Sequence, residues 1–435
     1  MFFADAKRLL EYEAQSLLHR LSEIRPFALT LPMVPAAAPS VAAQASIEAY
    51  LSDGRRRLRA SVRRFLAWLR SPQGSQASPA RAQERFTAVR LQFLTVIEQF
   101  DLFSDALVER SQHGYGEWAG GLDVAATEAL TLPRYLVDPP PVICHLDRGA
   151  GAAIRRVRTR LPGGGRNPVA LIRVPRERMI GSGVASSLVH EVGHQGAELL
   201  GLLPVLERRL LARAARAGAD RPAWLLYHAW ISEIVSDLWG VARVGIAATL
   251  GLMGVVSLPK AFVFRIEAGD PHPAPWIRVK ISAAFGNALF PDPQWDQVAA
   301  IWGSFYPLSE AEPRARLLMS LLEATLGEFV SLSLGSALPQ LGGAPLGAIF
   351  PRSDRTPGRL RALRPLVRRD RAQLADLTPT LAFAAIGQAK FDGAIGAWAE
   401  SSMLSHLLRY WALRSTIDAS IAFANRLPAA WPAAA

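Results

Sequence analysis

The chain has 435 residues, of which half are hydrophobic, and a formal net charge of +12. This composition excludes a wholly disordered chain, and the length exceeds what one hydrophobic core usually serves, so we expect two or three structural regions. The one cysteine, Cys144, excludes an internal disulfide and a zinc site built from cysteines.

The first 130 residues predict a helical region. Apolar residues recur at helical spacing over 4–23, over 43–70 and from Pro79 onward. Prolines near 24–42 interrupt this pattern and predict an extended linker. The N-terminus lacks the basic start and apolar segment that are typical of a secretion signal.

Arginine supplies the excess positive charge, in clusters at Arg55–Arg59, Arg63–Arg64, Arg155–Arg160 and Arg352–Arg371. One interpretation is a surface for an anionic partner, such as an anionic lipid or a nucleic acid. The other is a coding preference for arginine that is spread over solvated helix faces. Because no nucleic-acid motif and no stacking aromatic residues accompany these clusters, we favour the second interpretation.

Three short strands are predicted next, at 141–146, 153–159 and 169–174. We expect them to form a small antiparallel sheet that packs on the helix that follows. We place Val169–Val174 at the edge of this sheet, where unpaired backbone groups can hold a peptide substrate in extended form.

After these strands the sequence reads His190-Glu191-Val192-Gly193-His194, within an apolar stretch that is typical of a buried helix. Residues four apart lie on one face of a helix, so His190 and His194 can bind one metal ion. Glu191 projects to the edge of that face, where it can deprotonate a water bound to the metal. The alternative is two histidines that meet by chance, although this pattern is rare in a chain with eight histidines.

A second apolar helix is predicted to begin at Pro222, and it carries Glu233 and Asp237 four residues apart. Buried charges without partners are costly. That cost is relieved if Glu233 is the third metal ligand and Asp237 accepts a hydrogen bond from the outer N–H of a liganding histidine. The alternatives are a polar helix face for both carboxylates, and Glu198 or His228 as a competing ligand.

The His-Glu-x-x-His motif with a downstream Glu-x-x-x-Asp resembles the gluzincin metallopeptidases. His272-Pro273, with Arg278 six residues after the histidine, is similar to a segment of the CAAX prenyl endopeptidase and HtpX-like family. The resemblance covers residues 167–285 and implies a zincin-type core with one zinc ion per chain. It also implies that His272 and Arg278 border the active site and stabilise the charged intermediate, a role that suits a donor aimed at an oxyanion. The alternative is a proline-stiffened turn in which His272 caps the helix that follows and Arg278 forms a salt bridge.

The longest apolar run, Val244–Leu258, is shorter than the roughly 20 residues that span a bilayer, and it predicts a buried core helix. Members of that family with membrane roles have clear spanning helices, which are not evident here. Membrane spanning is therefore not expected, and we expect a cytoplasmic protein for which peripheral association with a membrane stays open. Beyond residue 305 the sequence predicts further helices, with a Gly- and Pro-rich loop at 342–357.

These patterns predict a predominantly helical α+β fold, with a zincin-type catalytic core at 131–305 between helical regions at 1–130 and 306–435. The predicted function is that of a zinc-dependent hydrolase, a metallopeptidase that cleaves a peptide or protein substrate. The alternative is a non-catalytic helical interaction protein, with a structural or vestigial zincin core, that binds an acidic partner.

Overall fold

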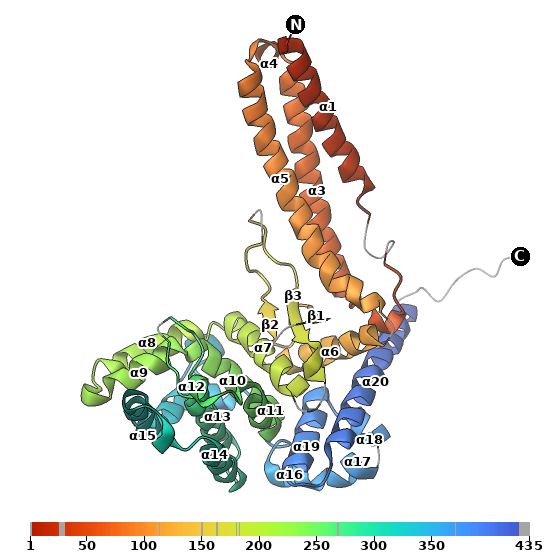
Figure 1. Cartoon of the computed structure of the whole chain (residues 1–435). Coiled ribbons are helices and arrows are strands. Elements are labelled where there is room, and N and C mark those ends of the chain that lie inside the picture. Colours follow the sequence, from red (N-terminus) through yellow and green to blue (C-terminus); the bar gives the residue numbers. More distant parts are fainter. Residues whose placement is uncertain are drawn as a thin grey trace, which may run out of the picture.

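The computed structural model is 73% helical with one three-stranded sheet, which confirms the predicted helical α+β fold. The residues that the structure describes are 2–25, 31–112, 114–148, 151–161, 164–179, 181, 183–267, 269–369 and 371–425. A stalk of long helices projects from a broader body that contains the sheet (Figure 1).

The stalk has a hydrophobic core of its own, in which Leu17, Val62 and Phe86 from three long helices pack together. Its helices are α1 (Phe2–Glu23), α3 (Val41–Arg70), α4 (Pro72–Gln76) and α5 (Pro79–Val108). Ser40 and Ser78 cap α3 and α5, because their side-chain oxygens accept hydrogen bonds from backbone N–H groups of the first turn. The bounds of α1, α3 and α5 confirm the helices predicted at 4–23, at 43–70 and from Pro79 onward. Part of the predicted linker, residues 26–30, lies outside the described residues, and a 3₁₀ turn, η1 (Pro35–Ala37), forms within the rest.

The sheet differs from the prediction in its pairing. Its strands are β1 (Val142–Asp147), β2 (Ala153–Arg155) and β3 (Ala170–Pro175), in the order β1-β3-β2. β1 runs parallel to β3 and β2 runs antiparallel to it, so the sheet is mixed. The prediction of Val169–Val174 as an edge strand is wrong, because β3 is the central strand. Its almost continuous apolar run reflects burial on both faces of the sheet.

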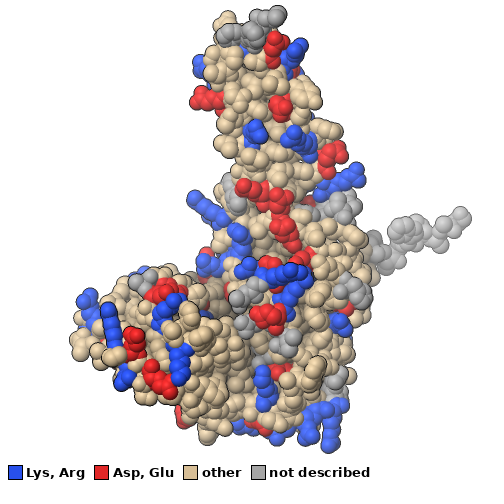
Figure 2. Space-filling view, viewed as in Figure 1, with Lys and Arg blue, Asp and Glu red and all other residues tan. Residues whose placement is uncertain are grey.

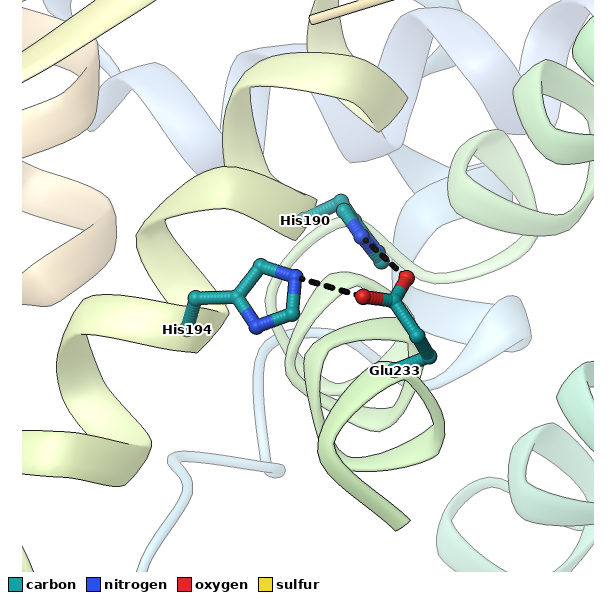
Figure 3. A group of neighbouring side chains, drawn as sticks. All are labelled: His190, His194 and Glu233. Carbon is teal, nitrogen blue, oxygen red and sulfur yellow. Dashed lines mark ion pairs between the residues drawn. The ribbon is translucent and has the colours of Figure 1, made fainter. Parts of the chain in front are cut away.

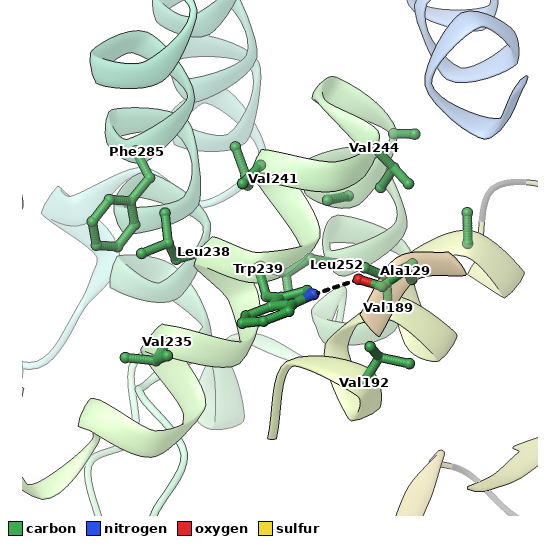
Figure 4. Packing of buried hydrophobic residues seen from close by; sticks show 14 of the residues in the cluster. Ala129, Val189, Val192, Val235, Leu238, Trp239, Val241, Val244, Leu252 and Phe285 are labelled. Atoms are coloured by element: carbon green, nitrogen blue, oxygen red, sulfur yellow. Dashed lines mark hydrogen bonds between the residues drawn. The ribbon is translucent and has the colours of Figure 1, made fainter. Parts of the chain in front are cut away.

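The centre of the body is built from the motif helix, three helices that pack on it and two more that pack on those. They are α6 (Tyr115–Leu130), α7 (Gly183–Leu199), α10 (Ile231–Val244), α11 (Ile246–Val256), α13 (Pro275–Leu289) and α19 (Pro379–Phe391). α7 packs on α10 and α11 and contacts β2 and β3. The indole N–H of Trp239, from α10, donates to the carbonyl of Ala129 at 3.0 Å within this core (Figure 4). The predicted buried helix in Val244–Leu258 is confirmed as α11, most of whose residues are buried.

The remaining helices flank this centre. They are α8 (Leu203–Ala214), α9 (Arg221–Ala229), α12 (Lys260–Val263), α14 (Gln294–Phe305), α15 (Pro313–Gly335), α16 (Pro357–Ala362), α17 (Arg364–Arg369), α18 (Arg371–Asp376) and α20 (Ala397–Ala424). Short 3₁₀ turns are η2 (Glu109–Ser111), η3 (Arg176–Met179), η4 (Gly218–Asp220), η5 (Leu308–Glu310), η6 (Pro339–Leu341) and η7 (Leu346–Ala348). α20 packs against α6, so the predicted N- and C-terminal regions contact each other. The predicted division into three regions stays a prediction.

Among the described residues, α15 alone is long and apolar enough to cross a membrane by length and composition. It packs on α13 and α9, and it buries Met319, Leu322 and Phe329. Helices of this length and composition also occur in the cores of soluble proteins, so α15 does not by itself indicate a membrane span.

Candidate metal centre

The close approach of α7 and α10 depends on two glycines of the motif helix. A Cβ atom added at Gly193 would lie 2.7 Å from the Cα of Ser236, and one at Gly196 would lie 2.3 Å from the Trp239 ring. Both distances are too short for any larger residue, so only glycine lets the two helices touch backbone to backbone. This contact brings the carboxylates of α10 within reach of the histidines of α7.

The three predicted metal ligands converge between these helices (Figure 3). Nε2 of His190 lies 3.2 Å from Oε2 of Glu233, and Nε2 of His194 lies 3.2 Å from Oε1 of the same carboxylate. One ligand atom from each residue lies within 4.8 Å of the other two. Among the described residues, this is the only group of three or more histidine, cysteine or acidic side chains that could hold a metal ion.

The donor set and its spacing fit zinc. Zinc binds imidazole nitrogen and carboxylate oxygen at about 2.0–2.2 Å, and tetrahedral geometry then separates two ligand atoms by roughly 3.3 Å. Each histidine Nε2 lies 3.2 Å from a different oxygen of the Glu233 carboxylate, and one ligand atom from each residue lies within 4.8 Å of the other two, so the three groups are close enough to hold one ion. Three protein ligands also leave the fourth tetrahedral position open, as a catalytic zinc site requires. Zinc binding itself stays a prediction.

Asp237 supports the ligands from one turn further along α10. Its Oδ1 atom lies 2.8 Å from Nδ1 of His190, which leaves Nε2 of that ring directed at Glu233. A carboxylate on the outer nitrogen fixes the orientation and tautomer of a liganding histidine. The role predicted for Asp237 therefore agrees with the observed contact.

Arg278, on α13, reaches the same carboxylates from the other side. Its Nε donates to Oδ2 of Asp237 at 2.7 Å, and its Nη2 donates to Oδ1 of Asp237 at 3.0 Å and to Oε2 of Glu233 at 3.2 Å. All three side chains are buried, so the guanidinium balances two carboxylates in a region of low polarity. These contacts form the salt bridge that the sequence analysis gave as the alternative role of Arg278. Its role at an oxyanion stays a prediction.

Hydrogen bonding changes the proton affinities of the predicted ligands. Burial, the largest influence on His190, favours its neutral form, but hydrogen bonds to Asp237 and Glu233 outweigh it and raise the pKa of His190 to about 9. Burial would likewise raise the pKa of Glu233, yet the hydrogen bonds from His190 and His194 hold that pKa well below its usual range. The Glu233 carboxylate is therefore ionised, as a metal ligand must be.

Glu191 lies beside the ligands and outside their set. Its side chain is buried, and burial raises the pKa of its carboxyl, although the neighbouring His190 and His194 act in the opposite direction. A buried carboxyl group with a raised proton affinity suits a group that takes up a proton and later delivers it. This position agrees with the predicted general base.

His272 approaches the ligands from the segment before α13. Its Nε2 atom lies 3.5 Å from Oε2 of Glu233, and its Nδ1 atom lies 2.7 Å from Oδ1 of Asp270. The His272 side chain is 54% exposed, whereas Glu233 is buried, so the histidine lies at the solvent side of the centre. The structure therefore brings His272 to the site, as the sequence predicted.

The competing ligands lie elsewhere. Glu198 pairs with Arg156 at 2.7 Å, on the turn of α7 beyond His194. His228, near the end of α9, is not in the group of converging side chains. Neither residue replaces Glu233 in this arrangement.

The sequence reasoning missed two supporting contacts of the site and the two glycines between its helices. Asp270 holds His272, and the Asp-Pro-His order offered a signal, because an Asp two residues ahead can accept a hydrogen bond from the backbone and side chain. The hydroxyl of Ser232 lies 3.4 Å from Nδ1 of His194. The only sequence signal for this contact was that Ser232 directly precedes Glu233. Gly193 and Gly196, three residues apart, were the signal for close helix packing.

Comparison with protein-family models, with curated proteins and with solved structures gave no match.

Proposed function

We propose that this protein is a zinc-dependent hydrolase, and more narrowly a metallopeptidase. The observation that carries the proposal is the convergence of His190, His194 and Glu233 from two helices, with the buried carboxylate of Glu191 beside them. One zinc ion per chain, bound by the three ligands, would supply a Lewis acid and lower the pKa of a water molecule to near neutrality.

The side chains around the ligands divide the remaining tasks. Glu191 accepts the proton of the attacking water and later delivers it to the leaving amine. His272, held by Asp270 and open to solvent, donates a hydrogen bond to the developing oxyanion. Arg278 and Asp237 keep His190 and Glu233 in place, and we assign Arg278 this positioning role ahead of direct contact with the oxyanion.

Because β3 is the central strand, the edge that aligns the substrate cannot be Val169–Val174, and we assign this task to the edge strand β2. One side of β2 pairs with β3, and the described residues place no strand on its other side. An extended peptide can add to such an edge through backbone hydrogen bonds. β2 also contacts the motif helix α7, so a peptide on this edge would run close to the metal centre. A cytoplasmic location is part of this proposal, as is a peptide or protein substrate.

The test combines metal content with turnover. We expect the purified protein to bind one zinc ion per chain and to cleave members of a mixed library of fluorogenic peptides. Glu191→Gln should keep the zinc and lose cleavage, whereas Glu233→Ala should lose both. Glu84→Ala is the control, because Glu84 is exposed on α5 of the stalk and takes no part in the site, and it should change neither. A Glu191→Gln variant that cleaves like the wild type would remove the proposed mechanism.

The stalk favours a second candidate function, that of a non-catalytic interaction protein that binds an acidic partner. It projects from the body, has a core of its own and exposes arginines such as Arg63 and Arg64 on α3. Protein without zinc and without cleavage, combined with salt-sensitive binding of an anionic polymer, would favour this candidate over the hydrolase.

A further inference from the structure

The connection between β2 and β3 carries an unusual concentration of positive charge. After β2 the chain continues as a second ladder, in which the N–H of Arg158 donates to Asn167 O at 2.9 Å and the N–H of Leu161 donates to Gly165 O at 2.8 Å. We call residues 155–161 and 164–166 the arginine hairpin. Its exposed arginines are Arg155, Arg158, Arg160 and Arg166. In Figure 1 this connection rises beside the lower part of the stalk, and Figure 2 shows blue side chains on that part of the surface.

Within the described residues, these arginines have no acidic partners. Arg160 and Arg166 occupy directly opposite positions on the ladder, where like charges repel each other and destabilise the pairing. Neighbouring arginines are neutralised, since Arg156 pairs with Glu198 and Arg173 pairs with Asp147. None of the four exposed arginines forms an ion pair with any carboxylate in the part of the chain that the structure describes. The hairpin therefore keeps an unfavourable concentration of charge that an anionic ligand would relieve.

The arginine hairpin is fixed to the metal centre. The N–H of Val157 donates to Oε1 of Gln195 at 2.7 Å, and Gln195 directly follows the ligand His194. The ion pair between Arg156 and Glu198 adds a second attachment to α7. On the other side, Leu161 is buried with residues of α3 and α5. A ligand on this hairpin is thereby held at a constant position relative to the histidines.

The alternation of β2 directs its arginine to one side of the sheet. Ile154 packs against the core that contains α7, whereas Arg155 lies opposite Leu171, whose side chain belongs to the core on the stalk side. In a peptide that pairs with the free edge of β2, every second side chain would point to the side of Arg155. Acidic residues at those alternate positions would lie on the side of Arg155, and the other exposed arginines of the hairpin follow Arg155 along the chain.

We propose that the free edge of β2 and the arginine hairpin bind an extended acidic segment of the substrate, with acidic side chains at alternate positions. This inference rests on the proposed peptidase function, because it names the substrate class of the same centre. A membrane surface offers negative charge without backbone groups. A single-stranded nucleic acid is bound through stacking aromatic side chains, which this hairpin does not contain. An unpaired strand edge next to the charges favours a polypeptide.

Binding is measured with the zinc-loaded Glu191→Gln variant, so that hydrolysis does not interfere. Two fluorescent ten-residue peptides are compared by anisotropy, one with Glu at alternate positions and one with Gln at the same positions. We expect the Glu peptide to bind about tenfold more tightly at low salt, since three exposed ion pairs contribute that much, and to lose this preference at high salt. The triple variant Arg155→Ala, Arg160→Ala, Arg166→Ala in the same background should abolish the preference.

The matched control is Arg63→Ala with Arg64→Ala, which removes exposed arginines from α3 and should leave the preference unchanged. Thermal unfolding of the triple variant shows whether it is folded, and we expect no loss of stability because repelling charges are removed. A second variant, Arg160→Glu with Arg166→Glu, should turn the preference toward a peptide with Lys at the alternate positions. This reversal tests the contact independently of the triple variant.

Equal binding of the Glu and Gln peptides would overturn the inference, as would an equal loss of the preference in the α3 control. Binding to vesicles that contain phosphatidylserine, without preference between the peptides, would assign the charges to a membrane surface and also overturn it. If the wild type cleaves peptides whatever their charge, the peptidase proposal stands and the acidic docking surface fails. If the Glu peptide binds through the hairpin and the zinc-loaded wild type cleaves nothing, the docking surface stands and the peptidase proposal fails.

Discussion

Asp237 and His190 form a contact of 2.8 Å between Oδ1 and Nδ1, on the side of the imidazole ring opposite the Nε2 that faces Glu233. The contact joins α10 to α7 and sets the direction of the predicted ligand. Because Arg278 holds the same carboxylate through Nε at 2.7 Å, three helices determine the orientation of one imidazole.

Asp237→Asn is expected to weaken zinc binding by about 10- to 100-fold, because an amide orients His190 less well and makes the ring less basic. Competition with a chromophoric zinc chelator measures the affinity. Asp270→Asn is the control, since Asp270 holds His272 and none of the three predicted ligands. Equal zinc affinities of Asp237→Asn and the wild type would contradict the assigned role.

Zinc affinity is expected to rise with pH up to about pH 9. Zinc binds the neutral imidazole, and the pKa of His190 in the metal-free protein is raised to about 9, so below that pH zinc must displace a proton. The apparent affinity should therefore fall by about tenfold for each pH unit below pH 9, with release of one proton per zinc from this residue. Calorimetry in two buffers with different ionisation enthalpies counts the protons. An affinity that does not change between pH 7 and 8.5 would refute this expectation.

Arg278→Met should lower the free energy of unfolding of the metal-free protein by about 3–5 kcal/mol, because it leaves the carboxylates of Glu233 and Asp237 buried without a cation. Urea unfolding measures the loss, and added zinc should restore part of it by supplying positive charge at Glu233. The control is Arg414→Met, which removes an exposed pair with Asp418 and should cost less than about 1 kcal/mol. Losses of equal size in both variants would argue against a charge-balancing role for Arg278.

Gly193→Ala should separate α7 from α10, because the added Cβ would lie 2.7 Å from the backbone Cα of Ser236. We expect a loss of about 1–3 kcal/mol in the free energy of unfolding together with weaker zinc binding, since Glu233 moves with α10. Gly254→Ala, in α11, is the control, because no atom lies within 4 Å of its added Cβ and a helical alanine is more stable by about 1 kcal/mol. Unchanged zinc affinity in Gly193→Ala would show that the site tolerates this separation.

Local sequence patterns were sufficient for the parts of the site that lie within one helix. The spacing of His190 and His194 places them on one face by helical geometry alone, and the spacing of Glu233 and Asp237 does the same for α10. The burial of both carboxylates inside an apolar stretch indicated that they needed partners. In the same way, the helical periodicity of the first hundred residues predicted the long helices of the stalk.

The relations between distant segments came only from the folded chain. The order of β1, β2 and β3 depends on which strands pair, and an apolar run such as Val169–Val174 does not distinguish a central strand from an edge strand. The partner of Arg278 depends on where α13 packs, 41 residues along the chain from Asp237. Hydrogen bonds within a helix follow from its own backbone, whereas contacts between strands and between helices depend on the path of the whole chain. For this reason the sequence could indicate the residues that we propose as ligands, whereas packing decided which residues hold and surround them.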